Sequence, residues 1–78
     1  ADLPEADTEL LTALRALRLS FAKERGVPAY VVFTDRSLVD MARRKPATID
    51  AFAEVHGVGA AKLRDFAEPF LAAINGKT

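Results

Sequence analysis

The sequence predicts an all-α fold, a small single domain built as a bundle of about five short helices. Apolar residues recur at intervals of three and four along most of the chain, which is the period of one helix face. Capping and helix-breaking residues separate these stretches. Residues 30–33 favour a strand, but no second run of this kind exists to pair with them, and an isolated strand leaves its backbone groups unsatisfied.

The chain is expected to divide into a linker tail over residues 1–6 and one folded domain over residues 7–76. The tail is acidic, contains Pro4 and has no apolar face. Residues 10–78 carry all eleven Lys and Arg but only seven Asp and Glu, so this part has a net charge of about +4 although the whole chain is neutral. The chain has no initiator Met, and we expect it to be a piece of a longer protein.

The first helix is expected to begin at Asp7 or Thr8, either of which can cap it, and to end at Gly26. Pro28 then prevents its continuation. One face of this helix is apolar, at Leu10, Leu14, Leu17 and Phe21. Three arginines fall on a face turned away from that stripe, at Arg15, Arg18 and Arg25. The spacing therefore predicts a basic ridge behind the apolar one.

Around residues 28–33 we expect an extended or 3₁₀ connector instead of a strand. Its apolar residues must anchor the turn, so Val32 or Phe33 should be buried. The ring of Tyr30 should be largely exposed to solvent.

Two further helices are expected after this connector. The second should begin at Thr34 or Asp35, end at residues 45–46 and carry apolar residues on its inner side. The inner residues are Leu38, Val39, Met41 and Ala42. The third is short, is capped by Thr48 and ends at Gly57. It runs through Ile49, Phe52 and Ala53.

The last helix is expected to begin at Gly59 and to end at Gly76. Because Pro69 lacks a backbone N–H, we expect a kink or a split into two helices near Glu68. The apolar residues of all the helices should meet in one contiguous core. Its members are Leu14, Leu17, Phe21, Leu38, Phe52, Leu63, Phe70 and Ile74.

The sequence contains no constellation expected of an enzyme. His56 has no Ser or Cys nucleophile beside it, and no Gly-rich phosphate loop follows a strand. With no Cys and one His, the chain can form neither a disulfide nor a Cys- or His-based zinc site. No apolar run approaches the roughly 20 residues needed to span a bilayer. We therefore expect an intracellular domain without catalytic residues and without a metal.

Two segments resemble the signature turns of the HRDC domain, the helicase-and-RNase-D C-terminal module. The first is Val-Pro-Ala-Tyr-Val-Val-Phe-Thr-Asp at 27–35, and the second is Val-His-Gly-Val-Gly-Ala-Ala-Lys-Leu at 55–63. The resemblance covers residues 8–75. It implies the HRDC domain of a bacterial RecQ-type DNA helicase, an all-helical accessory unit.

The end of the first helix is a candidate surface for nucleic acid. The turn after Gly26 should bring Tyr30 close to the predicted ridge of Arg15, Arg18 and Arg25. An exposed aromatic ring stacks on a base while neighbouring cations meet phosphates. The resemblance implies the same role, because Tyr30 matches the tyrosine that is implicated in single-stranded DNA contact in bacterial RecQ helicases. The alternative is a solubilising charged face, with Tyr30 packed in the core.

The turn before the last helix is a second candidate. Gly57 and Gly59 allow the backbone to approach a phosphate, free amides begin the next helix, and Lys62 adds a charge. This turn also resembles the hairpin of helix-hairpin-helix proteins. The alternative is that both glycines only end one helix and begin the next. Arg36, in the second helix, is a further candidate for nucleic-acid binding, whereas the cations at 43–45 are explained in part by the helix dipole.

Acidic residues on the later helices are candidates for docking between domains, namely Asp50, Glu54, Asp65 and Glu68. Bacterial RecQ modules often carry lysines where this chain has Ala16, Leu19 and Glu68. Fewer cations predict weak DNA binding. The acidic groups suit a basic partner surface, such as the DNA-binding face of the helicase core.

The sequence and the resemblance together predict an accessory domain that adjusts how a RecQ-type helicase engages structured DNA. The expected partners are single-stranded or branched DNA and the helicase core of the same chain. ATP and Mg are expected in the longer protein, and no cofactor is expected in this domain. We expect a monomer in the bacterial cytoplasm, at the nucleoid and with no membrane contact. The HRDC domain of an RNase D-type exoribonuclease and a purely protein-interacting module are the alternatives.

Overall fold

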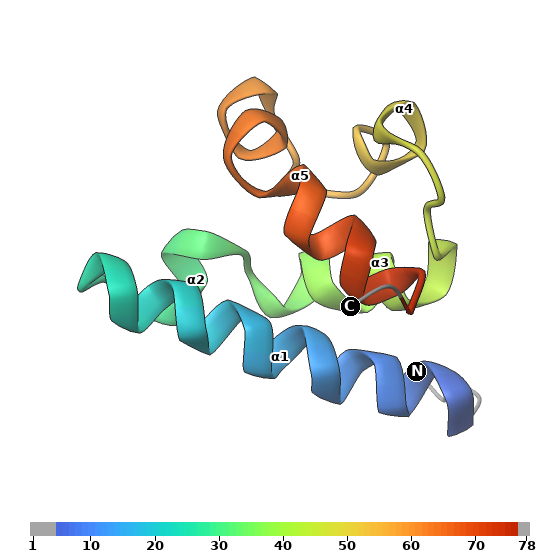
Figure 1. Ribbon diagram of the computed structural model, residues 1–78, viewed down its shortest axis with the longest axis horizontal. Coiled ribbons are helices and arrows are strands. Elements are labelled where there is room, and N and C mark those ends of the chain that lie inside the picture. Colours follow the sequence, from blue (N-terminus) through green and yellow to red (C-terminus); the bar gives the residue numbers. More distant parts are fainter. Residues whose placement is uncertain (1–4, 77–78) are drawn as a thin grey trace.

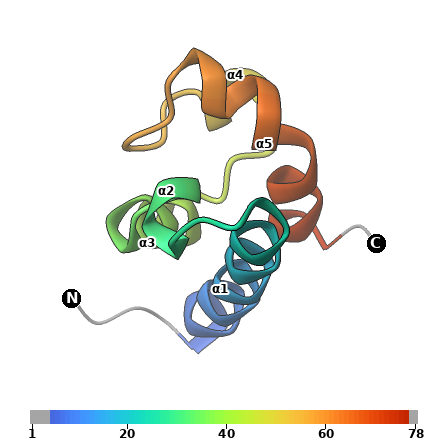
Figure 2. The ribbon, with the colours of Figure 1, turned by 90° about the vertical axis from the view of Figure 1, so that its left-hand side faces the viewer.

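The computed structural model describes residues 5–76, with side chains from Thr8 onward, and it confirms an all-α domain with five helices in that range. These are α1 (Glu5–Arg25), α2 (Ala29–Val32), α3 (Asp35–Arg44), α4 (Ile49–Phe52) and α5 (Ala60–Ile74). The long helix α1 runs along one side of the molecule (Figure 1). Figure 2 looks along α1 and places α2 and α3 on one side of it and the later part of α5 on the other. The expected linker tail falls mostly on residues 1–4, which lie outside the described part of the chain.

Helix α1 begins earlier than expected and ends where expected. Its first residue is Glu5, so Thr8 lies inside the helix instead of capping it. At the other end Gly26 takes the left-handed conformation, with φ of +67°. The Val27 N–H donates to the Ala22 carbonyl at 3.0 Å, which closes a Schellman-type turn.

The connector over residues 28–33 differs from the expected extended or 3₁₀ segment, because it contains one turn of α-helix, α2. Pro28 and Phe33 on either side of it are extended. The first hydrogen bond, from Val31 N–H to Pro28 O at 3.0 Å, is of 3₁₀ type, and the next, from Phe33 N–H to Ala29 O, is of α type. The turn is helical because it satisfies these groups locally in a segment that has no strand partner.

Side-chain caps begin α3 and α4 at the expected threonines. Thr34 Oγ1 accepts from Ser37 N–H at 3.2 Å, and Thr48 Oγ1 accepts from Ala51 N–H at 3.1 Å. Helix α3 ends at Lys45, which is left-handed with φ of +46° and is followed by the buried Pro46. The sequence therefore predicted both starts and the end of α3.

Helix α5 is a single helix that contains Pro69, so the expected split into two helices is wrong. The expected kink is present, since the ribbon changes direction partway along the helix (Figure 1). Asn75 ends the helix by donating through Nδ2 to Leu71 O at 2.9 Å and to Pro46 O at 3.2 Å. Gly76 follows with φ of +71°, as expected of a residue after a helix end.

One apolar core joins all the helices, and the predicted core residues belong to it. Leu14, Leu38, Phe52 and Phe70 are buried, while Leu17, Phe21, Leu63 and Ile74 pack against them. Phe33 lies at the centre of a cluster formed by all five phenylalanines, and its ring centroid is 4.9 Å from that of Phe70. Phe66, which is 5% exposed, is a core residue that the sequence analysis did not include.

Candidate nucleic-acid interface

Tyr30 lies on the outer side of α2 and is 67% exposed, as predicted. Val31 beside it is 45% exposed, whereas Val32 and Phe33 are each 1% exposed. The short helix therefore presents an aromatic ring to solvent and is anchored by the two residues that follow. A tyrosine held in this way has the form of a stacking platform for a nucleobase.

Lys62, on α5, fixes the position of α2 by hydrogen bonds to its backbone. Its Nζ donates to the carbonyl oxygens of Val31 and Val32, the latter at 2.7 Å, and lies 5.5 Å from the centre of the Phe33 ring. The ammonium group thus offsets the partial negative charge at the end of α2. The prediction that Lys62 adds a charge for a phosphate remains a prediction, and two of the three N–H donors of its ammonium group are directed at the backbone.

The turn before α5 requires glycine at position 57 but not at position 59. Gly57 has φ of +79°, and a Cβ there would lie 2.6 Å from Ser37 Oγ. That hydroxyl donates to the His56 carbonyl at 2.7 Å. Gly59 caps α5 in extended conformation, with nothing within 4 Å of a Cβ position. Gly57 is therefore needed by the fold itself, which supports the alternative reading of this glycine.

Arg18 does not belong to an exposed ridge. Its side chain is 13% exposed, and NH1 lies 2.8 Å from Asp35 Oδ1 and donates to Phe33 O at 3.0 Å. Its Nε is buried and has no hydrogen-bond partner in the described residues. Ala22, on the same helix stripe, is also buried, at 2%. The predicted basic ridge is wrong at its centre because this stripe of α1 packs against α2 and α3.

The other two arginines of the predicted ridge, Arg15 and Arg25, lie on either side of Arg18 along α1. The Arg25 guanidinium lies 4.7 Å from the centre of the Phe66 ring, in a cation–π contact. Arg25 also lines a groove of about 280 Å³ between α2 and α5, together with Val31, Lys62 and Asp65. Arg15 is exposed on α1. Arg25 is therefore the one arginine of this set that shares a groove with a residue of α2.

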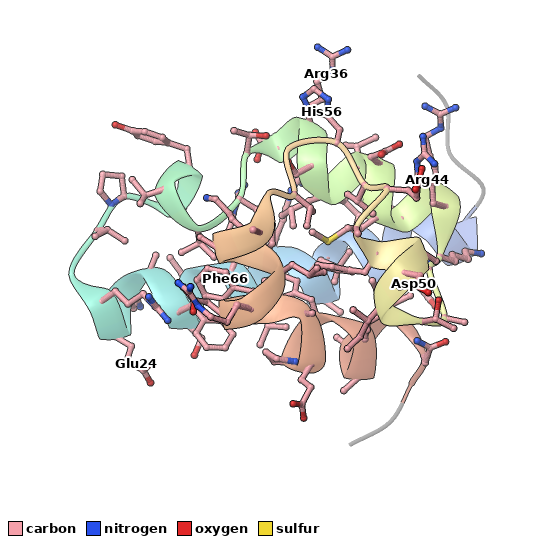
Figure 3. All side chains as sticks on the ribbon, turned by 90° about the horizontal axis from the view of Figure 1, so that it is seen from above. Glu24, Arg36, Arg44, Asp50, His56 and Phe66 are labelled. Atoms are coloured by element: carbon pink, nitrogen blue, oxygen red, sulfur yellow. The ribbon has the colours of Figure 1, made fainter. Side chains whose placement is uncertain are left out.

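Arg36 lies in a different groove, of about 350 Å³, along the outer face of α3. Arg43, Arg44 and His56 line this groove as well, and the sequence analysis did not include them among the site residues. In Figure 3 Arg36 and His56 project side by side from one edge of the molecule, with Arg44 further along it. The spacing of Arg36, Arg43 and Arg44 along one helix was the signal that could have found them.

The four acidic candidates for docking do not form one surface. Glu54 lines the α3 groove, Asp65 lines the groove between α2 and α5, and Glu68 borders a third hollow near the end of α5. Asp50 is exposed on α4 (Figure 3). Asp65 pairs with the neighbouring Arg64 at 3.1 Å. Any docking surface would therefore use a subset of these residues.

Within residues 5–76, no group of three or more His, Cys, Asp or Glu side chains is placed to hold a metal ion. In the same range, no helix combines the length and the apolar character needed to cross a membrane.

The five-helix fold is that of an HRDC-like domain. The family model described as HRDC domain matches residues 7–74, and the chain belongs to this family. A solved structure described as D. radiodurans RecQ HRDC domain 3 superimposes with a TM-score of 0.86 at 41% identity, covering 90% of this chain and 92% of that one.

Curated relatives of the chain are DNA helicases. The ATP-dependent DNA helicase UvrD2 of Mycobacterium tuberculosis is 43% identical over 95% of this chain, and the ATP-dependent DNA helicase RecQ of Pasteurella multocida is 39% identical over 92%. The chain spans 11% of the length of each of these helicases. It therefore corresponds to the HRDC domain of such proteins, and this domain is itself non-catalytic.

Proposed function

We propose that this chain is the HRDC domain of a longer RecQ- or UvrD2-type DNA helicase and that it contacts single-stranded or branched DNA weakly. The exposure of Tyr30 on an anchored turn carries this proposal. Stacking of a base on an aromatic ring is worth about 1–3 kcal/mol and tolerates any sequence. The relatives at 39–43% identity support a helicase rather than an RNase D-type parent. ATP and Mg would act elsewhere in the longer chain.

The proposal is tested by titrating the 78-residue chain with a single-stranded oligothymidylate and following the NMR shifts of the α2 amides. We expect weak, salt-sensitive binding, and Tyr30→Ala should lower the affinity about tenfold, because one stacking contact of about 1–3 kcal/mol is lost. Ile49→Ala is a matched control, since Ile49 is also an exposed apolar residue, at 51%, but lies on α4. An equal affinity of the Tyr30→Ala variant and the wild type would contradict the proposal.

Docking on the helicase core is a second candidate function. Asp50, Glu54 and Glu68 are exposed and make no ion pair within residues 5–76. The whole chain has a formal net charge of zero. Unpaired carboxylates on a nearly neutral domain suit a basic protein surface better than a phosphate backbone. In this mechanism the domain would regulate DNA affinity indirectly, by covering or releasing part of the core.

A further inference from the structure

The groove along the outer face of α3 contains cations that the fold does not use. Arg36 and Arg43 line it, are exposed, and make no ion pair with the side chains described from Thr8 onward, nor a hydrogen bond within that part of the chain. They are seven residues apart on one helix, so they share a face and lie about 10 Å apart along the axis. Arginines whose guanidinium groups have no ion pair in the described residues are available to an external anion.

The Asp40 carboxylate, which lines this groove, already has partners inside the domain. Asp40 Oδ2 lies 2.9 Å from Arg44 Nε, in an i,i+4 ion pair, and accepts from the His56 backbone N–H at 2.9 Å. The Asp40 side chain is 16% exposed. Its charge is therefore offset inside the domain, and Glu54 is the one carboxylate of the groove without a partner in the described residues. Among the described residues, two unpaired arginines, Arg36 and Arg43, thus face one unpaired carboxylate, and the net charge of the unpaired groups is positive.

The wall opposite α3 is fixed before any ligand arrives. The loop that carries His56 is fastened to α3 at two points, by the Asp40 bond to His56 N–H and by the Ser37 hydroxyl bond to His56 O at 2.7 Å. Gly57 permits this close approach because a Cβ would meet the same hydroxyl. The groove therefore needs no rearrangement of its wall to bind a ligand, and the entropy cost of ordering it is small.

We propose that this groove binds the phosphodiester backbone of a DNA strand, with Arg36 and Arg43 each meeting a phosphate. A separation of about 10 Å matches about three nucleotides at a rise of about 3.4 Å. The guanidinium fork suits phosphate oxygens. Helix α3 begins three residues after α2 ends, and Figure 3 shows both along one edge, so a strand stacked on Tyr30 can continue into the groove. The inference rests on the proposed function and adds a contact that is independent of the bases.

Two strands of equal length separate the two contacts. One is a 12-nucleotide oligothymidylate, and the other is a fully abasic strand with the same phosphates and no bases. Both are titrated into the 78-residue chain over a range of salt. Arg36→Ala with Arg43→Ala should lower the affinity for both strands about tenfold and reduce the slope of log K against log salt by about 1.4, since each phosphate on a single strand contributes about 0.7. Tyr30→Ala should weaken the oligothymidylate and leave the abasic strand unchanged.

Arg64→Ala is the control for the double variant, since Arg64 is an exposed arginine on α5 and lies outside this groove. Arg36→Gln with Arg43→Gln repeats the test with uncharged polar side chains that keep the first part of the arginine stem, if the alanine variant melts at a lower temperature. If the double variant binds the abasic strand with unchanged affinity and salt slope, the proposal that the groove binds phosphates is overturned. The role of Tyr30 would not be affected by that result. A poly-glutamate of equal charge is the last comparison. If it binds as tightly as the abasic strand and the double variants lose this binding, the groove binds an acidic protein segment and the proposal is overturned.

Discussion

At the scale of single residues, Arg18 shows how a structural cation resembles a ligand-binding one in the sequence. It lies four residues after Leu14 and four before Ala22, which are both buried, whereas the apolar pattern of the sequence continues from Leu14 through Leu17 and Phe21, one position before Arg18 and Ala22. The partners of its guanidinium, Phe33 O and Asp35, follow at least 15 residues later in the chain. No local pattern contains that contact, so the sequence predicted an exposed ridge that the tertiary packing removes.

Gly57 and Gly59 should respond to different extents to the same substitution. Gly57→Ala should lower the free energy of unfolding by about 2–3 kcal/mol, because the residue has φ of +79° and its Cβ would displace Ser37 Oγ from 2.6 Å. Gly59→Ala should change it by less than about 1 kcal/mol, since Gly59 has φ of −95° and open space around it. Urea denaturation of both variants measures the difference. Equal losses would mean that the close contact at Gly57 relaxes without cost.

At the scale of helices, the sequence predicted those elements whose boundaries are set locally. The caps at Thr34 and Thr48 and the helix end at Gly26 were all visible as residue types at the right spacing. Helix α2 was not, because a four-residue helix has too little periodicity to detect and depends on the packing of Phe33 and on Lys62, a residue about thirty positions later. The Tyr30 part of the candidate site could therefore be predicted, and so could the row of arginines on α3. The contact of Lys62 with α2 and the approach of the His56 loop to α3 could not, because both depend on residues far apart in the sequence.

The dependence of α2 on Lys62 makes a prediction about local stability. Lys62→Met keeps most of the apolar stem but removes both hydrogen bonds to the carbonyl end of α2. The amides of Val31 and Phe33 should then exchange with solvent several-fold faster relative to that of Leu38, which belongs to α3. Hydrogen exchange by NMR measures these rates.

Arg64→Met is the control for this variant, because Arg64 also lies on α5 and pairs only with the neighbouring Asp65, with its side chain 75% exposed. A uniform increase of exchange in α2 and α3 of Lys62→Met would indicate that Lys62 stabilises the whole fold and not this element.

At the scale of the whole molecule, one core of five phenylalanines and surrounding aliphatic residues fixes two different surfaces. The Phe33 ring contacts those of Phe52, Phe66 and Phe70, which come from α4 and α5. The same core thus positions α2, with its exposed tyrosine, and the α4–α5 connection, which forms one wall of the α3 groove. Because a domain of this size is marginally stable, the chain can place both surfaces on rigid elements only by sharing that core.

The neutral net charge of the whole chain leads to a prediction that separates direct DNA contact from docking. Asp50→Lys and Glu68→Lys each replace a negative charge by a positive one at an exposed position. If the domain contacts DNA directly, these variants of the 78-residue chain should bind single-stranded DNA as well as the wild type or slightly better, because added cations attract phosphates. If docking operates, the same variants placed in the full-length helicase should alter its DNA affinity, since a reversed charge would be repelled by a basic core surface.

We expect both effects, a weak direct affinity that falls steeply with salt and a changed DNA affinity of the full-length protein. Salt titrations of the domain and of the full-length helicase, with both variants, measure them. A domain that binds tightly at physiological salt, together with a full-length protein that is indifferent to both reversals, would show that the acidic residues have no part in regulation.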